Sequence, residues 1–231
     1  MAASVAAIVA AAGRGARLGR PKQLLELAGK PVVAWCLETL SSAAAIDEIV
    51  VACEPGDVDA CQRIGRDACG SKLRAVVRGG DRRQDSVRAA LSAVSPGIRF
   101  VVVHDGARPF VTVAAIDRVL DAARDCGAAV TGVRLSDTIK EVDESGAVTK
   151  TIPRDRLWAV QTPQAFAHDL LARAHGSASQ VEATDDAMLI EALGIARVRV
   201  VEGSRDNVKI TTPDDLTLAE LIARQRTARV R

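Results

Sequence analysis

The sequence has very few aromatic residues and almost no excess charge of either sign. Aromatic side chains make up 2% of the 231 residues, which is too few for a surface that stacks nucleic-acid bases. The formal net charge is +2, so the basic balance typical of nucleic-acid-binding domains is missing. A basic stretch, Arg224 to Arg231, is interpreted as a solvated chain end. We therefore expect no nucleic-acid partner.

Cysteine and histidine are scarce and follow no disulfide or hydrolase pattern. The five cysteines are an odd number and include no C-x-x-C pair. Cys61 and Cys69 fall on one face of an expected helix, where they would pack as small apolar residues. Free cysteines of this kind indicate a reduced, cytoplasmic protein. With three histidines and no serine nucleophile turn, a hydrolytic triad has little support.

Long hydrophobic runs are also missing. Met1–Ala12 is apolar, but it has no positively charged start and is too short to span a membrane. We expect a buried first strand here, and neither a secretion signal nor a membrane partner. The content of 48% hydrophobic and 26% charged residues is that of an ordinary globular protein.

The chain does contain β-branched apolar runs that alternate with helical patterns. This alternation predicts one α/β domain over residues 1–231, with a mostly parallel sheet between helices. The expected strands are Val5–Ala10, Ile46–Ala52, Arg74–Arg78, Phe100–His104, Ala128–Val133 and Arg197–Val201. The expected helices are Val32–Ser42, Asp57–Ala68, Gln84–Ala93, Val113–Asp125 and Asp185–Leu193. A last helix should begin at Pro213, capped by Thr212.

One segment departs from this alternation. Thr138–Val142 and Ala147–Ile152 flank a short Asp-Glu-Ser-Gly turn, which predicts a β-hairpin. Because an isolated two-stranded ribbon is only marginally stable in water, this arm at about residues 137–153 should find a partner surface. The alternative is a ribbon that folds back onto its own domain.

A glycine-rich loop, A-A-G-R-G-A-R-L-G, follows the first strand. In a doubly wound sheet, ligands bind at the carboxyl ends of the strands, and glycines let the backbone approach a phosphate chain. The spacing fits neither the P-loop nor the dinucleotide fingerprint. Arg14, Arg17 and Lys22 have no acidic neighbours in the sequence, which favours a polyphosphate ligand. A solvated basic loop is the alternative.

A second cluster, G-G-D-R-R-Q-D-S-V, begins at Gly79. Asp81 and Gln84 have the spacing of a capping box, which would open the next helix. That structural role is compatible with ligand binding, because helix N-termini in such sheets face the ligand crevice.

The third cluster, H-D-G-A-R-P, places Asp105 at the carboxyl end of a strand. There its carboxylate can hold Mg2+ through oxygen. The alternative is an ion pair between Asp105 and Arg108. Further on, Thr184 can be a helix cap, and Asp206 and Lys209 can be a surface pair.

These clusters follow one another in a specific order. A-A-G-x-G-x-R, P-K-Q, G-G-x-x-R-x-D-S-V, H-D-x-A-R-P, D-T-I-K, Q-T-P-Q, T-D-D and D-N-V-K-I-T lie between Val5 and about Leu221. In this order and spacing they closely resemble the 2-C-methyl-D-erythritol 4-phosphate cytidylyltransferases. The resemblance implies a Rossmann-like nucleotide-diphosphosugar-transferase fold with a protruding β-hairpin arm, a homodimer, and transfer of CMP from CTP to a polyol phosphate.

The resemblance also implies roles for single residues. Catalysis would involve Arg17, Lys22, Asp105, Arg154 and Lys209. CTP would bind at Ala11, Ala12, Gly13, Gly15, Gly80, Asp81, Ser86 and Gly106. The polyol phosphate would bind at Arg108, Thr138, Thr162 and Thr184, with Thr138 and Arg154 contributed across the dimer. Mg2+ would be held by Asp105, with Asp206 as a second candidate.

Two departures from the family pattern accompany these expectations. Gly106 stands where the family usually has alanine, and the loop from Arg17 to Pro21 is short. Two other functions stay open at this point. One is a ribitol 5-phosphate cytidylyltransferase, against which Ala107 argues, and the other is a nucleotide-binding regulator without turnover. Intact Arg17, Lys22 and Asp105 argue against the regulator.

Overall fold

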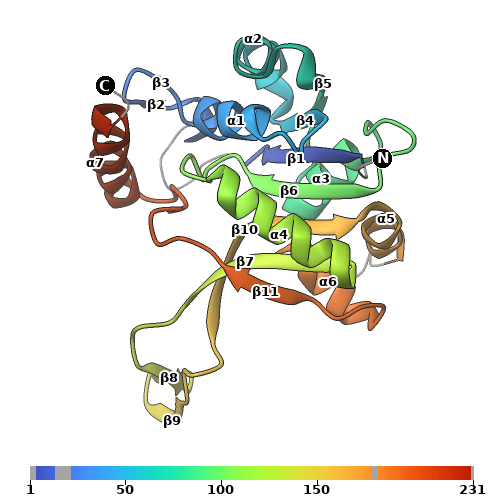
Figure 1. Ribbon diagram of the computed structural model, residues 1–231. Helices are drawn as coiled ribbons and strands as arrows, with labels where there is room; N and C mark the ends of the chain where they lie inside the picture. Colours follow the sequence, from blue (N-terminus) through green and yellow to red (C-terminus); the bar gives the residue numbers. More distant parts are fainter. Residues whose placement is uncertain (1–3, 14–21, 178–181, 230–231) are drawn as a thin grey trace.

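The computed structural model describes residues 4–13, 22–177 and 182–229. Within them, a seven-stranded sheet runs through the centre in the order β11-β7-β10-β6-β1-β4-β5 (Figure 1). The strands are β1 Val5–Ala11, β4 Glu48–Cys53, β5 Leu73–Arg78, β6 Phe100–Asp105, β7 Ala128–Arg134, β10 Trp158–Ala167 and β11 Arg199–Glu202. All pair in parallel except β10, which runs antiparallel to both neighbours. The predicted mostly parallel α/β sheet is confirmed.

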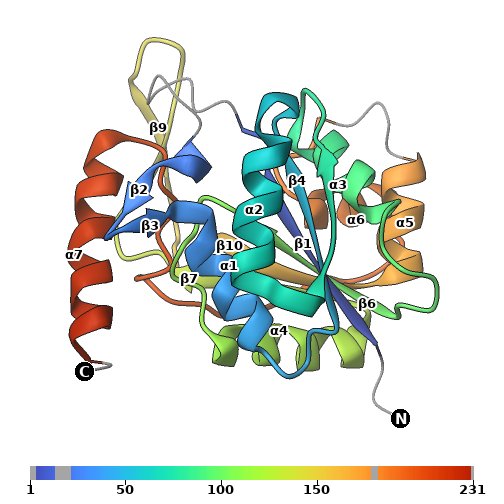
Figure 2. The same cartoon turned by 90° about the horizontal axis from the view of Figure 1, so that it is seen from above.

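Helices cover both faces of this sheet (Figures 1 and 2). Strand residues alternate between the two faces: in β6, Val102 packs on one side, and Val101 and Val103 pack on the other. The first side is covered by α1 Val32–Ser42, α2 Val58–Cys69 and α4 Val113–Cys126. The second is covered by α3 Arg83–Leu91, α5 His168–Ser177 and α6 Asp186–Leu193. Two apolar layers therefore hold the strand ends at fixed positions.

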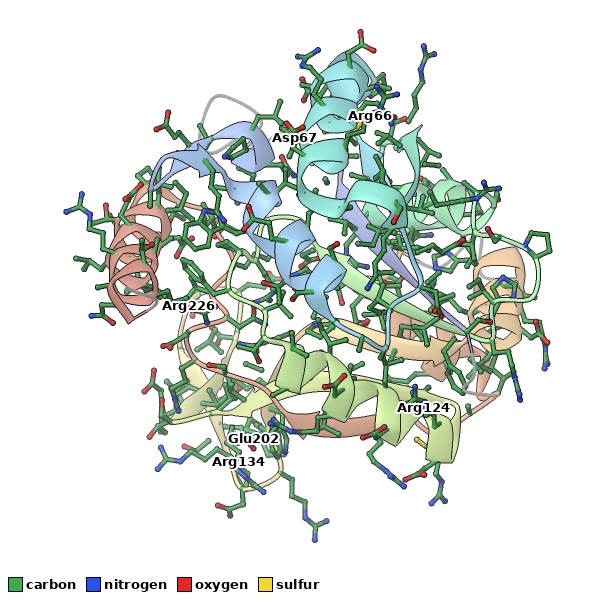
Figure 3. The ribbon with its side chains drawn as sticks, turned by 45° about the horizontal axis from the view of Figure 1, so that its top comes forward. Arg66, Asp67, Arg124, Arg134, Glu202 and Arg226 are labelled. Atoms are coloured by element: carbon green, nitrogen blue, oxygen red, sulfur yellow. The ribbon has the colours of Figure 1, made fainter. Side chains whose placement is uncertain are left out.

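The last helix, α7 Pro213–Arg229, packs beside the sheet against the small ribbon of β2 Glu26–Leu27 and β3 Lys30–Pro31. As predicted, Thr212 caps α7, because its Oγ1 accepts a hydrogen bond from the Asp215 backbone N–H at 3.3 Å. Arg226, labelled in Figure 3, donates to the Phe110 carbonyl at 3.0 Å and lies over the Phe110 ring. These contacts attach α7 to the loop that follows β6.

The predicted hairpin is present as β8 Ile139–Val142 and β9 Val148–Ile152, which pair only with each other. Figure 1 shows that this arm projects from the body of the molecule. Its side chains are exposed throughout except for the half-buried Ile139 and Ile152. The arm therefore does not fold back onto its own domain, which was the alternative interpretation.

The arm joins the sheet at the ends of two paired strands, β7 and β10. Arg134, at the end of β7, stacks over the Trp158 ring of β10. Arg118 of α4 donates to the Glu202 carbonyl of β11, and Figure 3 shows Arg134 and Glu202 near each other. The arm thus leaves the body from a defined position.

Two longer elements were not predicted from the sequence, β10 and α5, and neither was the short ribbon of β2 and β3. β10 has Pro163 in its interior and the polar residues Gln161 and Gln164 on a buried stretch, which is atypical of a central strand. Its pairing with β7 is interrupted between Val160 and Gln164, so the strand accommodates the proline at an irregularity. Elsewhere the expected elements agree with the structure to within about two residues, an ordinary uncertainty for element ends. Cys61 and Cys69 are buried on α2, as expected.

Among the described residues, none of the helices has both the length and the apolar character that crossing a membrane requires.

Candidate active site

A cleft opens where β1 and β6 end and α3 begins, as expected at the carboxyl edge of a parallel sheet. The volume of this cleft is about 150 Å3. We call it the glycine-loop pocket. Its wall is formed by Ala10, Ala12, Gly13, Lys22, Gln23, Gly80, Asp81, Arg82, Arg83, Ser86, Asp105, Ala107 and Lys209.

The first and second predicted clusters meet in this pocket because Gly79 has no side chain. A Cβ at Gly79 would lie 2.2 Å from the Ala12 Cβ and 2.8 Å from Ser86 Oγ. The Gly79 N–H donates to the Cys53 carbonyl at 2.7 Å, which fixes the loop to the end of β4. The next amide, that of Gly80, donates to Ser86 Oγ at 3.1 Å. The sequence therefore brings two backbone segments together as the sides of one narrow site.

Helix α3 opens differently from the capping-box alternative. Its N-cap is Arg82, which makes no side-chain cap hydrogen bond. Gln84 instead accepts a hydrogen bond from the Ala183 backbone N–H at 3.0 Å through its Oε1 atom. Gln84 thus ties α3 to the segment that leads into α6.

His104 and Thr162 together fix the loop after β6. The Asp105 N–H donates to Thr162 Oγ1 at 3.0 Å, and Thr162 Oγ1 lies 3.1 Å from His104 Nδ1. The Thr162 hydroxyl therefore donates to Nδ1, which leaves Nε2–H to donate to the Arg108 carbonyl at 3.0 Å. Burial lowers the pKa of His104 to about 4 and keeps the ring neutral. His104 is a structural residue of the site and not a base.

Asp105 is the centre of charge of the site. Its Oδ1 lies 3.0 Å from Arg83 Nε, and its Oδ2 lies 2.8 Å from Lys209 Nζ and 3.6 Å from Arg108 Nε. Burial by itself raises the pKa of the Asp105 carboxyl, but the positive charges of Arg83, Lys209 and Arg108 outweigh it and hold the pKa well below its usual range. The ion pair with Arg108 exists, as the alternative interpretation required, and it is one of three. Because Arg83 also pairs with Asp186 at 2.6 Å, the cluster has three cations and two carboxylates, and the remaining positive charge suits an anionic ligand.

A second hollow adjoins the first across this cluster. We call it the β10 pocket, and its volume is about 80 Å3. Asp105, Arg83 and Lys209 line both pockets and form their common wall. The rest of the β10 pocket is formed by Arg108, Val160, Gln161, Thr162, Gln164, Thr184 and Asp185.

The Q-T-P-Q segment of β10 holds the loops around this pocket. Gln161 donates to the Ser204 carbonyl at 2.9 Å, Thr162 holds the β6 end, and Gln164 donates to Asp185 Oδ2 at 2.7 Å. Asp185, and not Thr184, caps α6, because its side chain accepts the Met188 N–H at 2.9 Å. The exposed Thr184 is left on the pocket wall.

Lys209 reaches the common wall because the loop before it is fixed at two points. The buried Asn207 side chain donates to the Thr162 carbonyl at 2.7 Å, and the Ile210 N–H donates to the Ala107 carbonyl at 2.9 Å. The Asn207 carbonyl in turn accepts from Arg108 Nη1 at 2.8 Å. The D-N-V-K-I-T motif is therefore a scaffold for one lysine, which pairs with Asp105 and not with Asp206.

The structure places most of the predicted site residues on the two pockets. Lys22, Asp105 and Lys209, together with Ala12, Gly13, Gly80, Asp81 and Ser86, line the glycine-loop pocket, and Arg108, Thr162 and Thr184 line the β10 pocket. Ala11 packs into the core beside α1 and α4, while its neighbour Ala10 faces the pocket. Gly106 is buried beside Ala11 and Val9. Gly15 and Arg17 lie outside the described residues, as does the short loop before Pro21.

Three predicted residues lie away from both pockets of this chain. Thr138 and Arg154 are exposed at the base of the arm, where Arg154 donates to the Ser136 carbonyl. Asp206 is also exposed, and neither pocket includes it.

Sequence reasoning missed residues that the site uses. Arg83 joins both pockets, and Gln23 and Gln164 are buried on their walls. Arg83 and the two glutamines stood inside the quoted motifs G-G-x-x-R, P-K-Q and Q-T-P-Q, so the signal was present. The motif specifies Arg83 and leaves its neighbour Arg82 open, but it assigns no role to Arg83; in the structure Arg82 is more exposed and pairs with Asp85.

The site suits a magnesium ion that takes only one or two ligands from the protein. Among the described residues, no group of three or more His, Cys, Asp or Glu side chains could hold a metal ion. Mg2+ in nucleotide enzymes is usually bound by one or two carboxylates and otherwise by substrate phosphates and water. Asp105 on the common wall and Asp81 in the glycine-loop pocket match that donor set. Asp206 does not lie with them.

Comparisons with known proteins agree with this geometry. Residues 5–225 match the family model of 2-C-methyl-D-erythritol 4-phosphate cytidylyltransferase. Enzymes of that name from Pelotomaculum thermopropionicum and Syntrophus aciditrophicus are 45% and 44% identical, with 98% of this chain and 97% and 98% of theirs covered.

Solved structures give the same result. 4-Diphosphocytidyl-2C-methyl-D-erythritol synthase from Anaerococcus prevotii superposes with a TM-score of 0.86 at 32% identity, covering 96% of each chain. The cytidylyltransferase from Thermus thermophilus gives 0.78 at 39% identity, covering 97% of this chain and all of that one. The chain belongs to the 2-C-methyl-D-erythritol 4-phosphate cytidylyltransferase family.

Proposed function

We propose that this protein transfers CMP from CTP to 2-C-methyl-D-erythritol 4-phosphate, releasing pyrophosphate and forming 4-diphosphocytidyl-2-C-methyl-D-erythritol for isoprenoid precursors. One observation carries the proposal: two pockets of different character share a single charged wall of Asp105, Arg83 and Lys209. A nucleotide and a phosphorylated acceptor can thus meet at that wall.

The glycine-loop pocket would hold CTP. The turn from Gly80 to Ser86 offers backbone groups for the cytosine and ribose, while Gly13 and Lys22 face the triphosphate from the other side. The narrow approach at Gly79 fixes the distance between these two sides. CTP would therefore be oriented by both segments at once, with its α-phosphate toward the common wall.

The β10 pocket would hold the acceptor. Arg108 supplies a guanidinium for its phosphate, and Thr162 and Thr184 supply hydroxyl groups. An acceptor phosphate oxygen then attacks the α-phosphorus in line, and the bond to pyrophosphate breaks. The attacking oxygen is already anionic, so the site needs no general base, and positioning and charge stabilisation suffice. Lys209 and Lys22 would stabilise the charge that develops.

Mg2+ is proposed as the cofactor, with Asp105 as its protein ligand. When bound, it would neutralise phosphate charge as the α-phosphorus reacts. Since Asp105 already contacts Arg83 and Lys209, most of the ligands of Mg2+ would come from the triphosphate and water. Activity that survives complete removal of divalent ions by EDTA would contradict this assignment.

The proposed reaction is tested by pyrophosphate release with CTP and a panel of polyol phosphates. We expect 2-C-methyl-D-erythritol 4-phosphate to give the highest kcat/KM, and ribitol 5-phosphate a much lower one. A preference for ribitol 5-phosphate would mean that this compound is the acceptor. Absence of turnover with every acceptor, despite CTP binding, would support the regulator instead. The comparisons favour neither alternative.

We also propose a homodimer joined through the arm. The arm exposes Val142 at 53% and Val148 at 59%, and such a ribbon gains stability only from a partner surface. Thr138 and Arg154, which the family resemblance assigns to the substrate, lie at the base of the arm and outside both pockets of their own chain. In a symmetric dimer, each arm would carry them to the partner's β10 pocket.

Subunit mixing tests this shared site. Lys22→Ala and Arg154→Ala are each inactive in the proposal, but a mixed dimer contains one site with both groups intact. With random exchange half of the dimers are mixed, so roughly a quarter of all sites should recover. If exchange is proven and activity stays at the sum of the separate variants, Arg154 does not act across the interface.

The cellular location is proposed to be the cytoplasm. All five cysteines are free thiols, and four of them are buried, as is usual for proteins of reducing compartments.

A further inference from the structure

A chain of hydrogen-bonded side chains leads from the common wall into the helix layer behind it. Arg83 Nε donates to Asp105 Oδ1 at 3.0 Å, and Arg83 Nη1 donates to Asp186 Oδ2 at 2.6 Å. The other oxygen of Asp186, Oδ1, lies 3.0 Å from His175 Nε2. The guanidinium therefore bridges one carboxylate at the active site and one that contacts neither pocket.

The two outer members of this chain are fixed by the fold. Asp186 is the first residue of α6 and is fully buried, and His175 is buried in the last turn of α5. Burial by itself raises the pKa of the Asp186 carboxyl, but the charge of Arg83 and the hydrogen bond from His175 outweigh it and lower that pKa. Asp186 is thus an ionised, immobile anchor for Arg83.

This anchor determines how the carboxylate of Asp105 is turned. Because Arg83 holds Oδ1, the second oxygen faces Lys209 at 2.8 Å and Arg108 at 3.6 Å. A guanidinium that is bonded to one carboxylate only can rotate about its side chain. Bonded to two, it is held in one plane by the fixed geometry of its donors.

From this geometry we propose that Asp186, supported by His175, is a positioning residue for cytidylyl transfer that acts on Asp105 through Arg83. The inference rests on the proposed function and assigns a role to residues that touch neither the nucleotide nor the acceptor. It makes the α5–α6 layer part of the catalytic arrangement.

A purely stabilising role explains the chain less well. Buried ion pairs contribute little net stability compared with apolar side chains of the same size, because removing two charges from water is costly. The chain lies beside buried apolar residues of α3, α5 and α6, among them Val87, Leu171 and Leu189. Instead of ending within this layer, the charges continue to the wall that both pockets share.

The test compares Asp186→Asn with wild type in pyrophosphate release from CTP and 2-C-methyl-D-erythritol 4-phosphate. Asparagine keeps the volume and one acceptor for Arg83 but removes the charge. We expect kcat to fall by at least about tenfold, as is usual when the partner of an active-site ligand is lost. The KM for CTP should stay within about threefold, since an interaction that orders only the transition state does not alter ground-state binding.

A double-variant cycle separates positioning from general damage. If Asp186 acts only through Arg83, the double variant Arg83→Gln with Asp186→Asn has the kcat of Arg83→Gln alone. Should Arg83→Gln not fold, Arg83→Lys replaces it in the cycle. Arg88→Gln is the matched control, because Arg88 lies on the same helix, pairs with Asp85 at 2.8 Å and lines neither pocket.

The outcomes are distinct. Wild-type kcat in folded Asp186→Asn, or losses that multiply in the double variant, would overturn the inference. A loss of kcat that matches the decrease in folded protein would do the same, as would a set of variants none of which folds, since both mean a structural role. A wild-type enzyme without turnover would instead refute the proposed function.

Discussion

Gly79→Ala is the substitution whose effect follows most directly from the geometry of the site. The new Cβ would lie 2.2 Å from the Ala12 Cβ, whereas two carbon atoms in contact are separated by roughly 3.5–4.0 Å. The Ala12 Cβ is fixed to the backbone and cannot rotate away. The loop of Gly79 and the loop of Ala12 must therefore separate by more than about 1 Å to relieve the contact.

Two effects of known size should follow. Overpacking of this kind costs about 1–3 kcal/mol of the free energy of unfolding. For a chain of this length, each kcal/mol lowers Tm by about 2–4 °C. The separation also moves the two sides of the CTP site apart, and a displacement of about 1 Å can cost up to a hundredfold in rate. We therefore expect Gly79→Ala to lower both Tm and kcat/KM for CTP.

The assay is pyrophosphate release at varied CTP together with thermal unfolding. Gly56→Ala is the matched control, because its Cβ would meet nothing within 4 Å. Ala12→Gly in the Gly79→Ala background removes the worst contact and should restore part of both losses. If Gly79→Ala has the Tm and the KM for CTP of wild type, the close approach of these loops is not what shapes the site.

Three further predictions concern catalysis, specificity and pH. Lys22→Ala should lower kcat by roughly a hundredfold to a thousandfold at unchanged Tm. A variant that retains about a third of wild-type kcat would show that Lys22 has no catalytic role. CTP should exceed UTP in kcat/KM by orders of magnitude, because uracil leaves buried groups unpaired, and equal values would refute the role of Gly80–Ser86. His104 titrates at about 4 when folded and near 6.5 when unfolded, so the unfolded chain binds more protons between these values. Stability contributed by neutral His104 is therefore complete above pH 6.5 and decreases by up to about 3 kcal/mol toward pH 4. Urea unfolding without divalent metal should show a steeper slope for wild type than for His104→Gln, which keeps the contributions of Asp105 and Asp186; equal slopes would refute the role of His104.

Much of the fold was predictable because its signals are local. The runs that became β1, β4 and β6 are apolar on both faces, as expected for strands between two helix layers. The hairpin was predictable from its turn. In contrast, β10 runs against its neighbours with Pro163 and buried glutamines, whose side-chain amides donate to Ser204 and Asp185, 43 and 21 residues further along the chain. No local sequence pattern predicts such partners.

The site divides in the same way. The motifs identified the loops that reach the cleft, and Asp105, Lys209 and Arg108 were found on them. The importance of Arg83 could not be read from the sequence, because its second partner, Asp186, is more than a hundred residues away. Thr184 was considered as the cap of α6, but the cap is Asp185. Threonine and aspartate are both good N-caps, so the sequence alone does not decide between two neighbours of these types.

The most direct test of the account follows the oxygen atoms of the acceptor. The enzyme is incubated with CTP and 2-C-methyl-D-erythritol 4-phosphate that carries oxygen-18 at the non-bridging phosphate positions. The masses of the products are then measured by mass spectrometry. If an acceptor phosphate oxygen attacks the α-phosphorus at the common wall, the cytidylyl product retains all of the label and pyrophosphate contains none. Free CMP as the main nucleotide product, or a product that lacks label, would contradict the account.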